Sequence, residues 1–470
     1  MAGGLLVAVV ALAPDDAHAQ AQDGAPAPDA WRTRARVHPT DDGEGPVSAP
    51  KDARGDAEPR GLEPEDVALA VPRTILAVPA FLIRVAYLPI KGGLYLLGRY
   101  HVIDHVIDFL HNDERTAGVI PLVTFLGDQG VTVGFSAFHR GLGKHGEAIA
   151  LSAKFGGQYV QSYGLGCTAP GGAGTPFNVE VATRYDVEPH PRFFGFGGGD
   201  LADPPASPSD PRAVNTESTF YQRRGLVRAR AGAWVVDELN LGAEGVLKSR
   251  SFGEKPGDES IPSIEEAYDT RDLVGYDQGY ALVEALLDLR FDSRQPAGAT
   301  ASGVYLHAFG GGVPPQNGLG YVHYGGEITG FIDIYKGARV IALRAVHESV
   351  WGSDDAIPFT EMPRLGGASR LRGFQSDRFR DKNTAVLTAS YHYPIHEYVA
   401  GSLFLDLGSV GKTYEDLVTP RNFRVGGGGG LLFRSRDSKL FTFQLAYGDS
   451  LQFVFTSDPL VTFDTHTETL

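Results

Sequence analysis

The chain has 470 residues, of which 60 are glycine and one is cysteine, and its formal net charge is −15. The single cysteine, Cys167, excludes an internal disulfide framework and a zinc site built from cysteines. The negative charge argues against a general nucleic-acid binder, which needs basic surfaces for phosphate groups, so no nucleic-acid partner is expected. Apolar residues make up an ordinary 42% of the chain, which argues against a bundle of membrane helices.

The first 65 residues predict export and then a linker. Residues 5–13 form a short apolar run, and Ala17-His18-Ala19 resembles the small-residue site that is cleaved on secretion, although no basic residues precede the run. Residues 1–19 are therefore predicted to be a signal peptide. Residues 20–65 are rich in Ala, Pro and Asp and have few large apolar side chains, so they predict a disordered linker.

Residues 66–115 predict a short amphipathic helical segment. Arg84, Lys91 and Arg99 interrupt its apolar runs, whereas a membrane-spanning helix needs about 20 apolar residues. Short helices at a membrane interface, or packed inside a pore, fit this composition, and an ordinary buried helical hairpin fits it equally well. His101 and His105 lie four residues apart, but zinc needs three or four convergent ligands, so no metal site is predicted.

From about residue 116 the apolar side chains recur at every second position, as they do in β-strands. In residues 281–292 one face carries Ala281, Val283, Ala285, Leu287, Leu289 and Phe291, and the other carries Glu284, Asp288, Arg290 and Asp292. A soluble β-sandwich also alternates. Here, however, the polar face carries charges and hydroxyl groups while the apolar face is unbroken, which favours a barrel in lipid.

Segments of about ten residues repeat over residues 116–457, and short connections alternate with longer ones near 197–216, 253–277, 353–384 and 411–421. This pattern is typical of an antiparallel transmembrane barrel with short periplasmic turns and long outer loops. Its sheet has to close, because open strand edges are not tolerated in lipid. The predicted fold class is therefore all-β, a transmembrane β-barrel of about 14–16 strands, followed by a tail of residues 458–470.

A glycine-rich segment, residues 363–374, lies in one of the long connections and contains Arg370 and Arg372. Asp406 follows on a strand, on the face that strand parity turns into the barrel. A guanidinium group binds a carboxylate through two hydrogen bonds, which a lysine does not match, so Arg372 can pin the loop to Asp406. Spacing alone leaves a second possibility open, namely a solvated loop arginine and an unrelated carboxylate in the lumen.

Leu371-Arg372-Gly373-Phe374 resembles the V/L-R-G-F/Y signature of the outer-membrane insertase and translocase superfamily that includes BamA, TamA and the two-partner secretion translocases. Phe404-Leu405-Asp406-Leu407-Gly408 resembles the F-x-D-x-G strand motif of the same superfamily, and the two motifs occur in the order found there. The resemblance covers about residues 116–457 and implies a barrel of about sixteen strands in the bacterial outer membrane.

The same resemblance implies roles for particular residues. Arg372, Gly373 and Phe374 would form a loop motif inside the lumen, and Phe404, Asp406 and Gly408 would form its partner motif on the barrel wall. In the family, the first and last strands form a weak seam through which substrate strands or lipids pass. The resemblance therefore implies insertion or translocation of protein or lipid without enzymatic activity, and it implies no cofactor.

Two features depart from the family pattern. Members with known insertion activity carry N-terminal periplasmic POTRA repeats that receive substrate, and residues 20–115 show no such pattern. The last strand of the family usually ends on an aromatic residue, whereas this chain continues from Phe455 to Leu470. The chain resembles a short-N-terminus member, so a passive pore or a structural barrel remains the alternative. The expected partners are outer-membrane lipids, together with unfolded outer-membrane protein clients or a periplasmic subunit.

Two short motifs resemble those of soluble enzymes, but no catalytic residues are predicted. Residues 406–413 end like a phosphate-binding loop, yet the first glycine position is Asp406 and no apolar helix is predicted after Thr413. Gly448-Asp449-Ser450-Leu451 spells the GDSL block of esterases. A hairpin turn explains Gly-Asp-Ser fully, and no Ser-His-Asp order follows.

Overall fold

The computed structural model describes residues 110–456, except 111, 113, 115, 143–145, 158, 170–175, 254–259, 296–301, 336–338, 397–398 and 435–438. The predicted signal peptide (1–19), linker (20–65) and tail (458–470) lie outside the described residues. So do His101, His105 and most of the predicted helical segment 66–115. Within the part of the chain that is described, no helix is long and apolar enough to cross a membrane.

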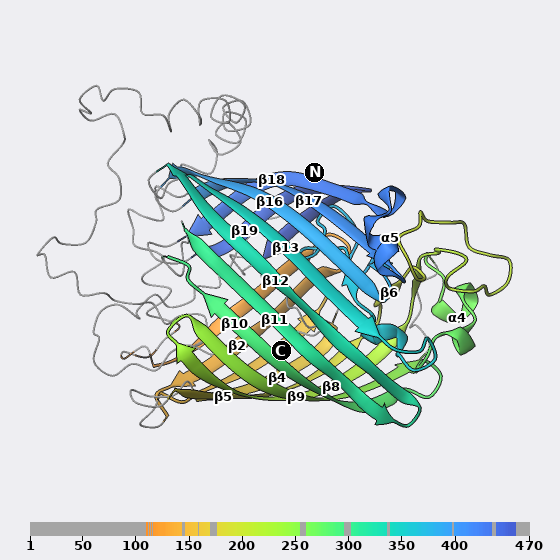
Figure 1. Ribbon diagram of the computed structural model, residues 1–470, viewed down its shortest axis with the longest axis horizontal. Coiled ribbons are helices and arrows are strands. Elements are labelled where there is room, and N and C mark those ends of the chain that lie inside the picture. Colours follow the sequence, from red (N-terminus) through yellow and green to blue (C-terminus); the bar gives the residue numbers. More distant parts are fainter. Residues whose placement is uncertain are drawn as a thin grey trace, which may run out of the picture.

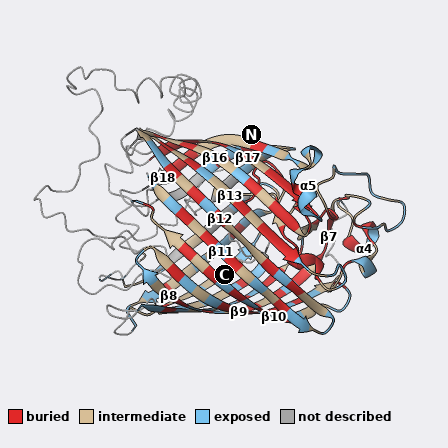
Figure 2. Ribbon diagram, viewed as in Figure 1, coloured by how far each residue is buried: buried red, intermediate tan, exposed pale blue. Residues whose placement is uncertain are grey.

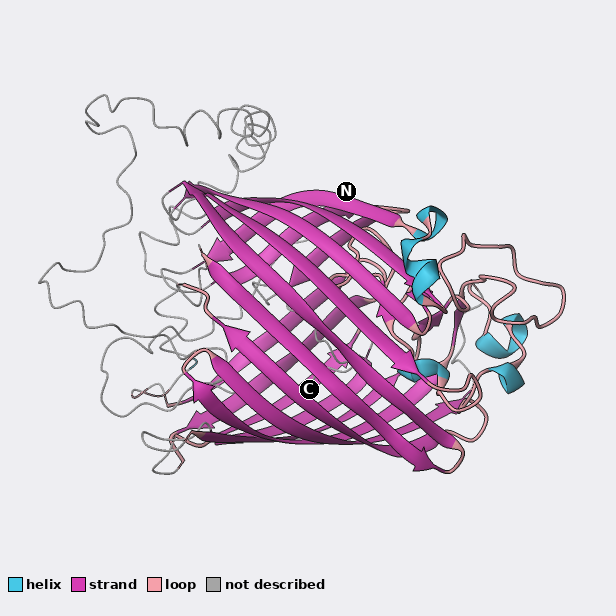
Figure 3. Cartoon of the chain, in the orientation of Figure 1, coloured by secondary structure: helices cyan, strands magenta, loops and turns pink. Residues whose placement is uncertain are grey.

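The described chain forms a closed barrel in which each strand runs antiparallel to its neighbours (Figures 1 and 3). Its strands are β1 (Ala117–Leu126), β2 (Gly130–Arg140), β3 (Ala148–Gly156), β4 (Tyr159–Ala169), β5 (Phe177–Glu188), β8 (Tyr221–Val236), β9 (Leu239–Gly253), β10 (Tyr280–Asp292), β11 (Gly303–Gln316), β12 (Leu319–Tyr335), β13 (Arg339–Trp351), β16 (Asn383–His396), β17 (Val399–Gly411), β18 (Arg424–Arg434), β19 (Lys439–Tyr447) and β20 (Leu451–Thr456). The predicted fold class is confirmed, with the strand number at the upper end of the expected range.

Burial alternates along the strands, as the banding of red and pale blue in Figure 2 shows. In β10, Leu282, Glu284 and Asp288 are buried inside the barrel, whereas Val283 and Leu287 are 50% and 68% exposed. The exposed face is thus the apolar one, which is the reverse of a soluble protein. This arrangement suits an outer wall in contact with lipid tails and a polar lumen.

The inward-facing charges are paired between strands. Nη2 of Arg230 on β8 lies 2.9 Å from Oδ2 of Asp288 on β10, and Nη2 of Arg344 on β13 lies 2.9 Å from Oε2 of Glu327 on β12. A buried charge without a partner destabilises the folded state strongly, whereas a paired and hydrogen-bonded one is tolerated. Ion pairs of this kind therefore line the lumen wall between β8 and β10 and between β12 and β13.

One end of the barrel carries the long loops. They are residues 189–220 with β6 (Arg192–Phe193) and β7 (Ser218–Thr219), residues 260–279 with α4 (Ile264–Ala267) and η2 (Thr270–Asp272), residues 352–382 with η3 (Phe359–Glu361), β14 (Arg364–Leu365) and β15 (Phe379–Arg380), and residues 412–423 with α5 (Tyr414–Val418) and η4 (Pro420–Asn422). At the opposite end, the short turn 237–238 connects β8 to β9. By the rule for outer-membrane barrels, the long loops face the outside.

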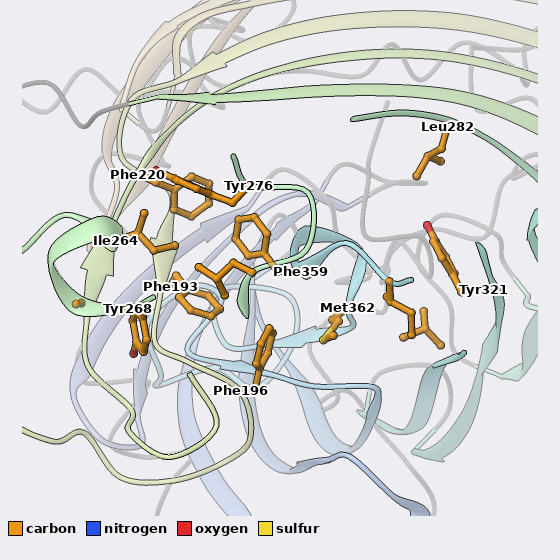
Figure 4. Packing of buried hydrophobic residues seen from close by; sticks show 14 of the residues in the cluster. Phe193, Phe196, Phe220, Ile264, Tyr268, Tyr276, Leu282, Tyr321, Phe359 and Met362 are labelled. Carbon is orange, nitrogen blue, oxygen red and sulfur yellow. The ribbon is translucent and has the colours of Figure 1, made fainter. Parts of the chain in front are cut away.

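Three of these loops fold together at the outer mouth of the barrel (Figure 4). Their buried side chains form one apolar cluster, the cap, with inward-facing residues of β10 to β13. It consists of Phe193, Phe196, Phe220, Ile264, Ala267, Tyr268, Leu273, Tyr276, Leu282, Val313, Tyr321, Val350, Ile357, Phe359 and Met362. The ring of Phe359 lies in its middle, with its centroid 5.6 Å from those of Phe193 and Phe220. Burial of large aromatic side chains contributes strongly to stability, so the cap is a packed part of the fold.

Candidate functional site

The loop of residues 352–382, the lumen loop, leads from β13 into the barrel and back to β16. Its two arms pair as β14 and β15, with Arg364 opposite Arg380 and Leu365 opposite Phe379. Beyond β14 the chain turns sharply, because Gly366 has φ 113° and its N–H donates to the carbonyl oxygen of Arg370 at 2.6 Å. The result is a compact tip, residues 366–377, held between the two arms.

Arg372 of the tip and Asp406 of β17 lie in direct contact. Nε of Arg372 donates to Oδ2 of Asp406 at 2.8 Å, and Nη2 donates to Oδ1 at 2.7 Å. The backbone N–H of Arg372 also donates to Oδ2, at 3.0 Å. The two side chains are 4% and 1% exposed, so the pair is both bidentate and buried. The structure thus brings together the two charged residues that the motifs single out.

The surrounding side chains satisfy the remaining polar atoms of this pair. The hydroxyl of Thr388 donates to Oδ1 of Asp406 at 2.8 Å, and Nη1 of Arg372 donates to Oε1 of Gln444 at 3.1 Å. The ring of Phe404 lies beneath the guanidinium group, with Cζ of Arg372 3.5 Å from the ring centroid. A buried ion pair is stable only when hydrogen bonds complete it in this way. Phe404 adds a cation–π contact.

Glycines let the tip lie against the wall. A Cβ atom on Gly408 would come within 2.9 Å of Cδ2 of Leu371, and one on Gly426 of β18 would lie 1.9 Å from the carbonyl oxygen of Arg372. Gly373 has φ 91°, and a Cβ there would lie 2.4 Å from the backbone carbon of Tyr447. Gly373 and Gly426, which face backbone atoms, therefore exclude any larger residue while the tip stays docked, whereas a larger residue at Gly408 would require the Leu371 side chain to move.

Phe374 turns its ring towards an apolar side of the tip. It packs in one cluster that also contains Val346, Leu365, Leu371, Phe379, Val386 and Val410. The rings of Phe374 and Phe379 meet edge to face with centroids 5.3 Å apart. The tip therefore has one apolar contact surface on β13, β16 and β17 and one charged contact at Asp406, and together they fix its position.

Residues 142–452 match the Omp85 superfamily domain. The chain belongs to the Omp85 superfamily. The fold is similar to that of BamA from Haemophilus ducreyi lacking POTRA domains 1–3, with 13% identity, a TM-score of 0.53, and coverage of 73% of this chain and 70% of that chain. No curated protein sequence matches the chain.

Two further solved structures are similar at lower scores. CdiB from Acinetobacter baumannii has 9% identity and a TM-score of 0.44, over 72% of this chain and 58% of that chain. CdiB from Escherichia coli has 11% identity and a TM-score of 0.46, over 75% of this chain and 67% of that chain. Superfamily membership, with the barrel fold, indicates a bacterial outer-membrane protein of the insertion and translocation class.

This Omp85 barrel holds its lumen loop at a further point that the sequence did not reveal. Glu361, in η3, accepts a hydrogen bond from Nζ of Lys248 at 2.8 Å and one from Nε of Arg250 at 3.2 Å, both on β9. The hydroxyl of Tyr280 donates to the same carboxylate at 2.5 Å. All four side chains are largely enclosed, so the loop is tied to β9 as well as to β17.

A third tie joins the tip to β13. Nη1 of Arg370 bonds to Oε2 of Glu348, whose Oε1 lies 3.1 Å from Nε2 of His323 on β12. Nδ1 of His323 in turn lies 2.7 Å from Oε1 of Glu284, which also pairs with Lys248. A continuous chain of hydrogen-bonded and ion-paired side chains therefore runs from Arg370 to the residues that hold Glu361.

The enzyme-like motifs have structural explanations in this Omp85 barrel. A helix does follow Thr413, contrary to expectation, but α5 has only five residues, and Thr413 and Asp416 cap its N-terminus reciprocally. Lys412 pairs with Asp354 rather than pointing into an anion site. Ser450 lies in the turn between β19 and β20, beside Asp449. Among the described residues, no group of three or more metal-ligating side chains converges.

Proposed function

We propose that this protein inserts or translocates protein, or lipid, at the bacterial outer membrane through a lateral seam between β1 and β20. The observation that carries the proposal is the weakness of that seam. Among the described residues, β1 pairs with β2 along all ten of its positions, whereas its pairing with β20 is described at one register pair, Leu126 with Val454. A strand edge that is so little paired offers free backbone groups to an incoming strand.

The proposed activity needs no catalytic residue and no cofactor, because strand exchange and bilayer deformation replace bond chemistry.

The alternative, a passive pore or a purely structural barrel, has less support. An open pore needs a clear lumen, whereas here Glu361, Arg370 and Arg372 tie one loop to β9, β13 and β17. The cap packs against β10 to β13 at the outer mouth. Steady ion conductance by the purified barrel, with no effect on client insertion, would favour the pore.

The proposal is tested by reconstituting the barrel in lipid vesicles and following the folding of an unfolded outer-membrane protein as client. The wild type should speed client insertion over empty vesicles, and Arg372→Ala should reduce that acceleration because the tip loses its tie to β17. Arg271→Ala is the matched control, since Arg271 is an exposed loop arginine. Equal insertion rates in empty and protein-containing vesicles, also after addition of periplasmic extract, would overturn the proposal.

A further inference from the structure

Two hairpin turns flank the seam at the outer end of the barrel. Residues 127–129 join β1 to β2, and residues 448–450 join β19 to β20. Among the described residues, the register pair between β1 and β20 is Leu126 with Val454, close to these turns. Contacts that hold the two turns in place therefore help to keep the seam closed.

The tip of the lumen loop lies directly on the β19–β20 turn. Ser450 N donates to the carbonyl oxygen of Gly373 at 3.3 Å. A Cβ atom on Gly448 would lie 2.7 Å from the same carbonyl oxygen and 2.5 Å from Cε2 of Phe374, so the tip packs closely against this glycine. The turn that carries β20 is thus seated on the tip.

The same stretch of loop also reaches the β1–β2 turn. Three residues after Gly373, the N–H of Ser376 donates to Oδ2 of Asp128 at 2.7 Å. The carbonyl oxygen of Asp128 accepts from Nη2 of Arg192 at 3.0 Å, and Nη1 of Arg192 pairs with Glu217 at 2.6 Å. Asp128 therefore fixes the first hairpin to the lumen loop on one side and to the loop of residues 189–220 on the other.

We propose that residues 373–376 form a clasp across the seam, which holds the first and last hairpins together and keeps β1 beside β20. Asp128 is a positioning residue in this arrangement, because it acts on the seam through the lumen loop. Release of Asp128 from Ser376 frees the β1 hairpin from the lumen loop, while Gly373 keeps the β20 hairpin on the tip. The biological meaning of the clasp rests on the proposed function, since that function requires the seam to open.

The geometry of the tip supplies a clean way to break the clasp. Arg378 N donates to the carbonyl oxygen of Gln375 at 3.2 Å, which closes a β-turn with Ser376 in its second position and Asp377 in its third. Asp377 has φ 59°, whereas Ser376 has no positive φ. Such a turn favours proline at its second position, so Ser376→Pro removes the N–H donor and keeps the turn.

Hydrogen exchange of the barrel in lipid nanodiscs, read by mass spectrometry on peptides covering residues 117–126 and 451–456, tests the clasp without any client. Asp128→Ala and Ser376→Pro should each raise exchange in both peptides about tenfold or more, the size expected for losing a hydrogen bond to a charged group. Asp203→Ala, which removes an exposed aspartate from the loop of residues 189–220, should leave exchange unchanged.

The outcomes separate the clasp from the proposed function. Unchanged exchange in Asp128→Ala and Ser376→Pro, in barrels that still show heat-modifiable migration, would overturn the clasp whatever happens to client insertion. Faster exchange in both variants supports the clasp even where the wild type inserts no client. Should Asp128→Ala fail to fold, Asp128→Asn keeps an acceptor oxygen without the charge and should give a smaller rise than Ser376→Pro; no rise in either would overturn the clasp.

Discussion

The carboxylate of Glu361 lies 2.8 Å from Nζ of Lys248, so the lumen loop is bound to β9 as well as to Asp406 on β17. The strands β10 to β13 and β16 lie between these two attachment points around the ring. One loop therefore braces two separated parts of the wall. The brace acts through buried ion pairs, so each attachment can be tested by substituting one residue of its pair.

Breaking the Arg372–Asp406 pair should destabilise the barrel. Arg372→Ala or Asp406→Ala leaves a buried charge without its partner, and the expected loss is about 3–5 kcal/mol in the free energy of unfolding. The double variant should lose less than the sum, because neither charge is then left alone. These free energies can be measured by unfolding the barrel in urea. The folded fraction is read on SDS gels, where the unheated folded barrel runs faster than the boiled protein. A loss below about 1 kcal/mol for either single variant would contradict the structural role of the pair.

Arginine at position 372 should not be replaceable by lysine. Lysine keeps the charge but cannot make two parallel hydrogen bonds to Asp406 or the planar contact with Phe404. Arg372→Lys should therefore recover less than half of the stability lost in Arg372→Ala. The same unfolding assay decides this, with Arg271→Lys as a control on an exposed loop arginine that should change stability by less than about 0.5 kcal/mol.

Glu361→Gln should weaken the second attachment of the lumen loop. The amide keeps the size of the side chain but leaves Lys248 and Arg250 without a common negative charge, and an expected loss of about 2–4 kcal/mol follows. The cap should loosen as well, because Phe359 lies two residues away on η3. Trypsin cleavage in the loop of residues 352–382 should become faster. Cleavage at the wild-type rate would show that Glu361 does not hold the loop.

Gly426→Ala should displace the tip without changing any charge. The added Cβ would lie 1.9 Å from the carbonyl oxygen of Arg372, so strand or loop must move. Gly245→Ala is the matched control, because a Cβ on Gly245, also in a barrel strand, would meet no atom within 4 Å. The expected result is reduced stability and faster loop cleavage in Gly426→Ala alone. Equal behaviour of the two variants would contradict the docked position of the tip.

Acid should release the loop of residues 412–423 from the lumen loop. Hydrogen bonds from the side chains of Lys382 and Lys412 lower the pKa of Asp354 from 3.8 to about 2. A carboxyl group with a lowered pKa stabilises the folded state above its unfolded pKa, and this contribution is lost as the pH falls from about 4 to about 2. Asp354 is half exposed, so the effect should stay below about 1 kcal/mol.

Hydrogen exchange in the loop of residues 412–423, corrected for intrinsic rates, would detect this release across the same pH window. Asp354→Asn should exchange faster at neutral pH and should lose the pH-dependent step. Asp203→Asn, on another outer loop, should keep that step. If exchange in the wild type showed no such step between pH 4 and pH 2, the Asp354 carboxylate would not hold this loop through its bonds to Lys382 and Lys412.

Much of the barrel could be predicted from the sequence, because each strand has to place charges inside and apolar groups outside. This constraint makes apolar and polar residues alternate in segments such as β10, where Glu284 and Asp288 face the lumen and Val283 and Leu287 face outward. The motif residues could be predicted too, since Arg372 and Asp406 each lie in a short recognisable string. The ranges proposed for the signal peptide, linker and tail stay predictions, as does the segment 66–115.

Other parts of the site could not be predicted. Glu361 stands 113 residues from Lys248, in a loop without periodicity, and nothing local distinguishes it from a solvated carboxylate. Asp128 lies in a short turn, where aspartate is common, so nothing in the sequence marks it as a contact residue. Its partner Ser376 contributes only a backbone N–H, which no side-chain pattern encodes. The short helix α5 could have been predicted from the capping pattern Thr413-x-x-Asp416. No apolar run follows this pattern, however, and for that reason no helix is predicted there.

The cap has a consequence for the route that any cargo takes. Loops from three parts of the chain pack with inward-facing residues of β10 to β13, so side chains of the fold itself fill this side of the outer mouth. A cargo that moved outward along β10 to β13 would meet this packed cluster, and the cap would have to unpack before the cargo could pass.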